Sequence, residues 1–271
     1  MAPSLSRPDQ ADTARAPSGP GQPTPRTALV TGASSGIGAA VAKRIAAERG
    51  WRLVVSGRDQ RRLAEIAGLT SSIPLRADLA TSAGVEHLVT GALDAVGHID
   101  LLVAAAGVGW AGPLPSMPAA AVDEVLTVNL TAVAHLVRLV LPGMLAAGRG
   151  QIVLVGSTAG TYGVRQEVVY SAAKAGIEAL AESLRHELRD TGVRVLHVVP
   201  AAVDTPFFER RGTPYTRGVP RPLPPDRVAE ALWDALVHGR EEVFAPRWLG
   251  LPRRLRGVAP GLFRRLASRF G

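Results

Sequence analysis

Cysteine is absent from this chain of 271 residues, which excludes a disulfide framework and a metal site built on thiolates. The six histidines show no close pairing at the spacing of metal ligands, and no run of 18 uncharged apolar residues could span a bilayer. Asparagine occurs once, as Asn129, and lysine occurs twice, as Lys43 and Lys174. The sequence therefore predicts neither a metal centre nor a transmembrane helix, and its rare polar residues become candidates for a site.

Hydrophobic residues make up 46% of the chain and charged residues 20%, which is ordinary for a soluble globular protein. Residues 1–25 are rich in Pro, Ser, Ala and Gly and lack the apolar run of a secretory signal. We therefore expect a cytoplasmic protein with a disordered leader over 1–25. One α/β domain over 26–246 and a C-terminal extension over 247–271 would follow it.

The formal charge of +8 is concentrated at the C-terminal end. Residues 240–271 hold eight arginines against Glu241 and Glu242, a net charge of +6, without an aromatic-studded strand or a recognition helix beside them. This distribution disfavours nucleic-acid binding. The stretch 261–270 has the pattern of a basic amphipathic helix, which we expect to dock on the domain or on a second subunit; weak contact with an anionic membrane is the alternative.

Short apolar strands and helical patterns alternate about six times along the chain. The strands are continuous apolar runs without alternation, as in a sheet that is covered on both faces. This pattern predicts a Rossmann-type, doubly wound parallel sheet of about seven strands with helices on both faces and a ligand crevice at the carboxyl edge. Strands are predicted over 27–31, 52–57, 72–77, 99–107, 150–157, 193–200 and 241–246, and helices over 36–49, from about 59, over 82–96, over 119–147 and around Tyr170 to about 191.

The stretch TGASSGIG, residues 31–38, joins the first strand to the first helix. Gly32 permits a tight turn, Gly36 lets the backbone approach a pyrophosphate, and Gly38 lets the helix pack closely on the strand. A turn that merely needs positive φ is the alternative. The strand before it and the helix after it favour dinucleotide binding.

The end of the second strand indicates which dinucleotide is bound. Arg58 follows Gly57 where an NAD site would place an acidic residue for the ribose hydroxyls, so NADP(H) is preferred over NAD(H). The alternative is that Arg58 is a solvated surface residue. Asp59 is interpreted as a helix N-cap.

Tyr170 and Lys174 lie one helical turn apart, on the same face. A nearby ammonium would lower the pKa of the phenol, and such a phenol can give or take a proton. Ser157, at the end of the fifth strand, could aim its hydroxyl at the same point, although a serine there is ordinarily a turn or cap residue. Asn129 begins a formal glycosylation sequon, which we discard because the position is predicted to be helical and buried.

Together these motifs resemble the short-chain dehydrogenase/reductase family, in particular its single-domain members with a TGxxxGxG turn, over about residues 26–246. The resemblance implies an NADP(H)-dependent oxidoreductase that interconverts a secondary alcohol and a ketone or aldehyde by hydride transfer. Tyr170 would be the general acid/base, and Ser157 would polarise the carbonyl. Lys174 would lower the tyrosine pKa and hold the nicotinamide ribose, and Asn129 would support a water-mediated proton relay.

The resemblance also implies a cofactor site along the carboxyl edge of the sheet. The chain departs from the family at AAAG (104–107), where Asn-Asn-Ala-Gly is usual, and at Pro200-Ala201, where Pro-Gly is usual. Side-chain support of the sheet and the shape of that turn are therefore not predicted. The implied cofactor residues are Gly32, Ser34, Ser35, Gly36, Ile37, Gly38, Arg58, Asp78, Leu79, Ala104, Gly107, Tyr170, Lys174, Pro200, Val203 and Thr205.

Residues 207–225, rich in proline and arginine, are predicted to form a mobile lid over a small carbonyl or alcohol substrate. The lid arginines either attract an acidic substrate or are solvated loop charges. A homo-oligomer is expected. The alternative function is a non-catalytic NAD(P)-binding sensor or scaffold on the same fold, which would need the phosphate cradle but no proton donor. A β-ketoacyl carrier-protein reductase is a further alternative among enzymes.

Overall fold

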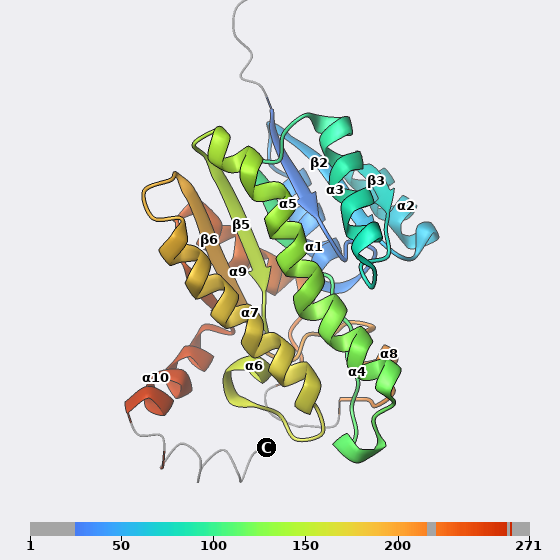
Figure 1. The fold of residues 1–271 in the computed structure, drawn as a ribbon, viewed down its shortest axis with the longest axis vertical. Helices are drawn as coiled ribbons and strands as arrows, with labels where there is room; N and C mark the ends of the chain where they lie inside the picture. Colours follow the sequence, from blue (N-terminus) through green and yellow to red (C-terminus); the bar gives the residue numbers. More distant parts are fainter. Residues whose placement is uncertain (1–24, 216–220, 259–260, 262–271) are drawn as a thin grey trace, which may run out of the picture.

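A seven-stranded parallel sheet forms the centre of the computed structural model (Figure 1), which describes residues 25–215, 221–258 and 261. The strand order is β3-β2-β1-β4-β5-β6-β7, which confirms the predicted doubly wound sheet. The order reverses between β1 and β4, and ligands of such sheets bind beyond the carboxyl ends of the strands at that point. The strands are β1(Arg26–Val30), β2(Trp51–Gly57), β3(Ile73–Arg76), β4(Leu101–Ala104), β5(Gly150–Val155), β6(Val193–Pro200) and β7(Glu242–Ala245).

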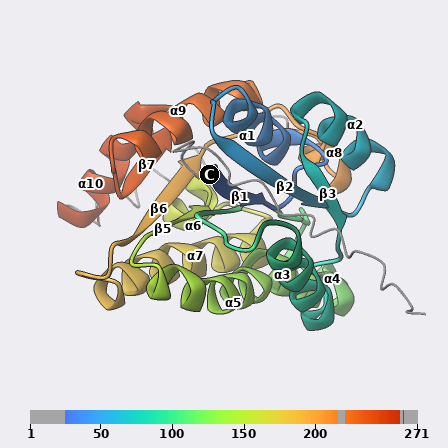
Figure 2. The same ribbon diagram turned by 90° about the horizontal axis from the view of Figure 1, so that it is seen from above.

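Helices cover both faces of the sheet. Figure 2 shows α1, α2 and α9 on one face and α3, α5 and α7 on the other. Helix α9, which packs against α1, was not predicted from the sequence. The helices are α1(Gly36–Ala46), α2(Gln60–Thr70), α3(Ser82–Val96), α4(Ala119–Leu126), α5(Ala132–Ala146), α6(Thr158–Tyr162), α7(Val168–Glu187), α8(Phe207–Arg210), α9(Pro225–Val237) and α10(Gly250–Val258), with the 3-10 segments η1(Leu114–Ser116) and η3(Arg247–Leu249) and the π-helical turn η2(Thr127–Thr131).

The core consists of two main layers that the sheet separates. Successive residues of β1 point to opposite faces, so Val30 packs in the layer under α1 and α9, whereas Leu29 packs in the layer under α3 and α5. Both side chains are fully buried. This two-sided burial explains the unbroken apolar runs, and each buried side chain contributes roughly 1.5–3 kcal/mol to folding.

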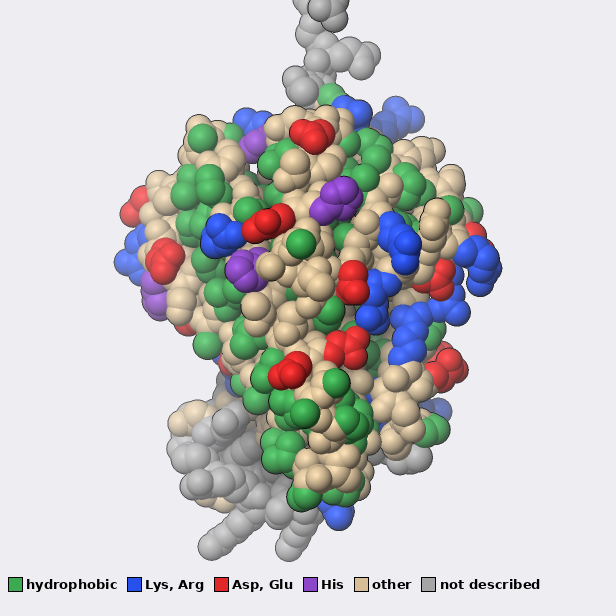
Figure 3. All heavy atoms as spheres, turned by 45° about the vertical axis from the view of Figure 1, so that its right-hand side comes forward, with side chains coloured by type: hydrophobic (Ala, Val, Ile, Leu, Met, Phe, Trp, Pro, Cys, Tyr) green, Lys and Arg blue, Asp and Glu red, His purple; other side chains and the backbone are tan. Residues whose placement is uncertain are grey.

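One stretch, Ala119–Ala146, is long and apolar enough to cross a membrane by length and composition alone. In the structure its α5 portion packs beside α3, and Leu136 and Val140 are buried in the sheet-facing layer. Its outer surface is also apolar in places. Within it Leu126 is 36% exposed and Leu145 42%. Figure 3 shows hydrophobic side chains gathered at the lower end of one face of the molecule.

Two predicted segments fall largely outside the described residues, and a third does so in part. The leader over 1–25 and the basic helix over 261–270 are described at only one residue each, and the lid over 207–225 lacks residues 216–220. The predictions for the leader and for the basic helix therefore stay predictions.

Candidate active site

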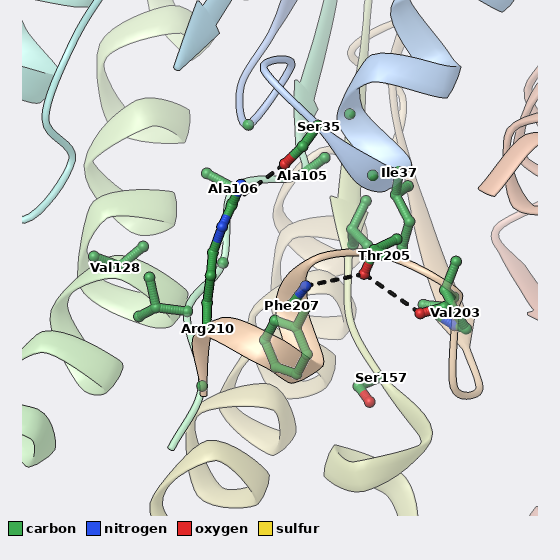
Figure 4. A pocket seen from close by; sticks show the side chains of 18 of the residues that line it. Ser35, Ile37, Ala105, Ala106, Val128, Ser157, Val203, Thr205, Phe207 and Arg210 are labelled. Carbon is green, nitrogen blue, oxygen red and sulfur yellow. Dashed lines mark hydrogen bonds between the residues drawn. The ribbon is translucent and has the colours of Figure 1, made fainter. Parts of the chain in front are cut away.

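A cleft of about 640 Å³ opens beyond the carboxyl ends of the strands (Figure 4). Ala104 and Asn129 are not part of its lining, and both are buried, with exposed fractions of 2% and 0%. All other predicted site residues do line it: Gly32, Ser34, Ser35, Gly36, Ile37, Gly38, Arg58, Asp78, Leu79, Gly107, Ser157, Tyr170, Lys174, Pro200, Val203 and Thr205.

The glycine-rich turn forms one wall of the cleft. Gly32 and Gly36 have φ angles of +69° and +57°, the left-handed region that favours glycine. A Cβ atom on Gly38 would lie 2.5 Å from the carbonyl oxygen of Gly32, so only glycine lets α1 begin this close to β1. Ser35, the N-cap of α1, makes no side-chain cap hydrogen bond in the described structure, which leaves the first N–H groups of α1 available to an anion.

The end of β2 carries two charged residues with different roles. Asp59 accepts a hydrogen bond from the backbone N–H of Arg62 at 3.0 Å, which confirms the predicted N-cap and lowers the pKa of Asp59. Arg58 forms an ion pair with Glu124 of α4, with Nη1 3.1 Å from Oε1. Sequence reasoning missed Glu124, because no local pattern links two residues 66 positions apart.

Ser157 follows β5 and begins α6. Its hydroxyl accepts a hydrogen bond from the backbone N–H of Ala159 at 3.1 Å, so the ordinary cap role is present. The same side chain lies near Tyr170 and is among the influences that lower the pKa of that phenol. The cap therefore holds the hydroxyl at the cleft.

Tyr170, in the first turn of α7, borders the cleft. Burial raises the pKa of Tyr170 well above its usual value, and the hydrogen bond with Ser157 opposes this only in part. The predicted lowering of this pKa by Lys174 is wrong for this structure: Nζ lies 5.8 Å from the centre of the tyrosine ring, and desolvation outweighs the favourable influences. Tyr170 is consequently a protonated phenol at neutral pH.

Lys174 is buried, with 5% of its surface exposed, and its Nζ donates a hydrogen bond to the carbonyl oxygen of Val155 at 2.9 Å. Burial lowers the pKa of Lys174 to about 8. A Cβ atom on Gly107 would lie 2.9 Å from Oδ1 of Asn129 and 3.8 Å from Nζ of Lys174. The glycine thus makes room for the amide oxygen of Asn129, whereas Lys174 lies at ordinary contact distance.

Asn129 sits in η2, where the helix predicted over 119–147 is interrupted by a π-helical turn. Its Nδ2 group donates hydrogen bonds to the carbonyl oxygens of Val108 and Val125, both at 2.8 Å. Oδ1 is buried and has no hydrogen-bond partner among the described residues. The amide therefore ties the helix to the loop after β4 and aims its oxygen at Gly107.

The AAAG departure has a structural compensation. The hydroxyl of Thr31 accepts hydrogen bonds from the backbone N–H groups of Ala105 and Ala106, at 3.2 and 3.3 Å, and it is fully buried. Ala104 lies inside the sheet, whereas Ala105 and Ala106 line the cleft, so the predicted cofactor contact at Ala104 stays a prediction. Support of the sheet at this point comes from the turn residue Thr31, which sequence reasoning did not single out.

The segment after β6 closes against the glycine turn. The hydroxyl of Thr205 donates to the carbonyl oxygen of Val203 and accepts from the backbone N–H of Phe207, at 3.3 and 3.4 Å (Figure 4). A Cβ atom on Gly36 would lie 3.0 Å from the methyl carbon of Thr205. These contacts place the start of α8 directly over the cleft.

The described part of the predicted lid contributes an aromatic wall and a buried arginine. The ring of Phe207 lies 5.4 Å from that of Tyr170, and Phe208 contacts Tyr215 at 5.0 Å, centre to centre. Arg211 is buried and forms an ion pair with Glu167, so neither of the two roles predicted for the lid arginines applies to it. Sequence reasoning missed these residues individually. The adjacent phenylalanines Phe207 and Phe208 were the feature of the sequence that could have indicated an aromatic wall here.

The fold and this cleft match a known family, whose short chain dehydrogenase model covers residues 26–215. The chain belongs to the short-chain dehydrogenase family and is an oxidoreductase. A putative ketoacyl reductase of granaticin polyketide synthesis from Streptomyces violaceoruber is 40% identical over 205 residues, which are 73% of this chain and 75% of that protein.

Solved structures agree with this assignment. A short-chain dehydrogenase/reductase from Burkholderia phymatum, in complex with NAD, has a TM-score of 0.79 at 30% identity, over 88% of this chain and 95% of that one. A short-chain dehydrogenase from Sphingobium yanoikuyae, in complex with NADPH, has a TM-score of 0.77 at 30% identity, over 87% of this chain and 95% of that one.

Proposed function

We propose that the protein interconverts a secondary alcohol and a ketone or aldehyde with NADP(H), using Tyr170 as the general acid/base. The observation that carries this proposal is the meeting of Tyr170, Ser157 and Lys174 at one end of a cleft whose other wall is the glycine turn. A sensor or scaffold would need the turn but not a phenol beside a serine hydroxyl and an ammonium.

The cleft fits a dinucleotide. Gly32 and Gly36 adopt left-handed φ angles, and the N-terminus of α1 offers free N–H groups to a pyrophosphate. Related structures hold NAD in one case and NADPH in another, so the preference for NADP(H) rests on Arg58 at the end of β2. A guanidinium suits a 2′-phosphate, and its ion pair with Glu124, 54% and 45% exposed, costs little to open.

The residues of the site supply the proton and bind the carbonyl oxygen. NADP(H), when bound, supplies or accepts the hydride. The raised pKa of Tyr170 keeps its hydroxyl protonated at neutral pH, so it can donate to a carbonyl oxygen as that oxygen gains charge. The Ser157 hydroxyl, held by α6, can hydrogen-bond the same oxygen. Lys174, which borders the cleft and whose Nζ donates to the carbonyl oxygen of Val155, would hold the nicotinamide ribose.

Reduction of a β-ketoacyl thioester is a second candidate. The relative at 40% identity that bears the name of a putative ketoacyl reductase favours it. The Tyr170 phenol would protonate the β-keto oxygen while the Ser157 hydroxyl hydrogen-bonds it, so the two candidates differ only in the substrate that the site accepts.

Replacing Tyr170 by Phe tests the role of the hydroxyl. We expect turnover of a panel of ketones, secondary alcohols and acetoacetyl-CoA, followed by NADPH and NADH absorbance, to fall by roughly 100-fold or more. Cofactor affinity, measured by fluorescence titration, should stay within a factor of about two. An unchanged rate would remove Tyr170 from the mechanism. A wild-type protein that binds cofactor but reduces nothing in the panel would favour the sensor.

Replacing Arg58 and Glu124 by Gln tests the cofactor preference. Arg58→Gln should weaken NADPH binding by about 10-fold and leave NADH binding unchanged. Glu124→Gln should tighten NADPH binding by a few-fold, because it releases Arg58 from a partly exposed ion pair. Equal effects on both dinucleotides would contradict a 2′-phosphate site at Arg58.

A further inference from the structure

Arg210, at the end of α8, reaches from the lid across the cleft to the glycine turn (Figure 4). Its Nη1 group donates a hydrogen bond to the hydroxyl of Ser35 at 3.3 Å, although the two residues are 175 positions apart. Ser35 is the N-cap of α1, where the helix leaves its first N–H groups free. A cation from the lid thus stands beside the positive end of a helix.

Arg210 differs from the other arginines of the cleft in its charge balance. Three arginines line the cleft in the described structure, and Arg58 and Arg62 are paired with Glu124 and Asp59. Arg210 forms no ion pair with any described carboxylate. A guanidinium has five donors in a planar fork, and a serine hydroxyl uses only one of them. The cation therefore retains donors that match the oxygens of a phosphate.

We propose that Arg210 binds a phosphate group of the dinucleotide and thereby couples the lid to cofactor binding. This inference rests on the proposed function, since it needs a dinucleotide in the cleft. The phosphate is either the pyrophosphate at the start of α1 or the 2′-phosphate near the end of β2. The hydrogen bond to Ser35 places the guanidinium near the start of α1. Arg210 is also among the charges that lower the pKa of Asp59, so its field extends to the end of β2.

The coupling follows from how α8 is attached. The backbone N–H of Phe207 donates to the hydroxyl of Thr205, which packs against Gly36 of the turn. At the other end of α8, Arg210 meets Ser35. A phosphate held between the guanidinium and α1 would fix both ends of this short helix. The ring of Phe207 would then stay against Tyr170. Cofactor binding would thus order the part of the cleft around Tyr170 before the substrate binds.

The test compares Arg210→Gln and Arg210→Lys with the wild type by fluorescence titration with NADPH and with NADH. Arg227→Gln on α9 is the matched control, because Arg227 is 73% exposed and lies outside the cleft lining. We expect Arg210→Gln to weaken binding by roughly 10-fold, Arg210→Lys by less, and Arg227→Gln not at all. Loss for both dinucleotides would identify the pyrophosphate, and loss for NADPH alone would identify the 2′-phosphate.

Hydrogen exchange of the backbone N–H groups of Arg210 and Arg211, which bond to Pro206 and Phe207, gives a second readout. Saturating cofactor should slow their exchange in the wild type but not in Arg210→Gln. Wild-type affinity of Arg210→Gln for both dinucleotides, or a loss matched by Arg227→Gln, would overturn the assignment and leave the proposed function intact. A wild-type chain that binds neither dinucleotide would refute the site itself, and this role with it.

Discussion

At the scale of single residues, the site contains a buried charge that works against folding. Lys174 is 5% exposed, and burial lowers its pKa from 10.5 to about 8. Below pH 8 both the folded and the unfolded chain carry this proton, and the folded chain bears the whole penalty, about 3 kcal/mol. Between pH 8 and 10.5 the folded chain has released a proton that the unfolded chain still holds, so the penalty disappears as the pH rises.

Replacing Lys174 by Met should therefore stabilise the protein at pH 7. We expect a gain of roughly 2 kcal/mol in the free energy of unfolding, because loss of the hydrogen bond to Val155 offsets part of the relief. The gain should shrink by pH 10. Urea unfolding at both values measures it, and Lys43→Met, at the only other lysine, is the control. A gain that is absent at pH 7, or that grows with pH, would show that Lys174 bears no such penalty.

At the scale of secondary-structure elements, an ion pair joins the end of α8 to the start of α7. Arg211, directly after α8, pairs with Glu167, the N-cap of α7, and their side chains are 7% and 15% exposed. Glu167 raises the pKa of Tyr170 and Arg211 lowers it, so the pair is electrically balanced beside the phenol. Removing one partner would leave an uncompensated buried charge.

Arg211→Leu alone should destabilise the protein by about 3 kcal/mol, and Glu167→Gln alone by a comparable amount. The double variant should recover at least 1 kcal/mol of the summed losses, because neither charge is then left unpaired. Urea unfolding of the four proteins forms the double-mutant cycle. Strictly additive losses would show that the two side chains do not interact.

At the scale of the whole molecule, Arg253 of α10 ties the C-terminal helix to two parts of the domain. It pairs with Glu178 of α7, with Nη2 2.9 Å from Oε1, and with Glu242 of β7. Tyr162 adds a hydrogen bond from its hydroxyl to the carbonyl oxygen of Leu249, just before α10. The start of the predicted C-terminal extension is thus integrated with the edge of the sheet.

Arg253→Gln should lower the free energy of unfolding by about 1 kcal/mol, since the three side chains are only partly buried. For a chain of this size the melting temperature should fall by roughly 2–4 °C. Arg227→Gln, at an exposed pair 3.8 Å long, is the control and should change it by less. Raising the salt concentration should reduce the difference in melting temperature between the wild type and Arg253→Gln, because salt screens partly exposed ion pairs. A shift no larger than that of the control would remove Arg253 as an anchor.

The predictions that succeeded depend on neighbours in the chain. The strands follow from apolar runs, the N-cap at Asp59 follows from its place before a helix, and the glycine turn follows from the order of strand and helix. The helix predicted over 119–147 is continuous over Ala119–Ala146, but the π-helical turn η2 inside it was not predicted, because this turn reflects how Asn129 bonds to the loop after β4. Helix α9 was not predicted, because it directly follows a proline-rich stretch that was interpreted as a loop.

The sequence by itself determined the doubly wound sheet, the glycine-rich turn between β1 and α1 and the edge of the sheet at which the cleft lies, because periodicity and turn chemistry are local. Only the tertiary structure decided the charges of the site. It buried Lys174, raised the pKa of Tyr170 and paired Arg58 with Glu124. Desolvation and Coulomb energies depend on distances between residues that are far apart in the chain, so they exist only once the elements have packed.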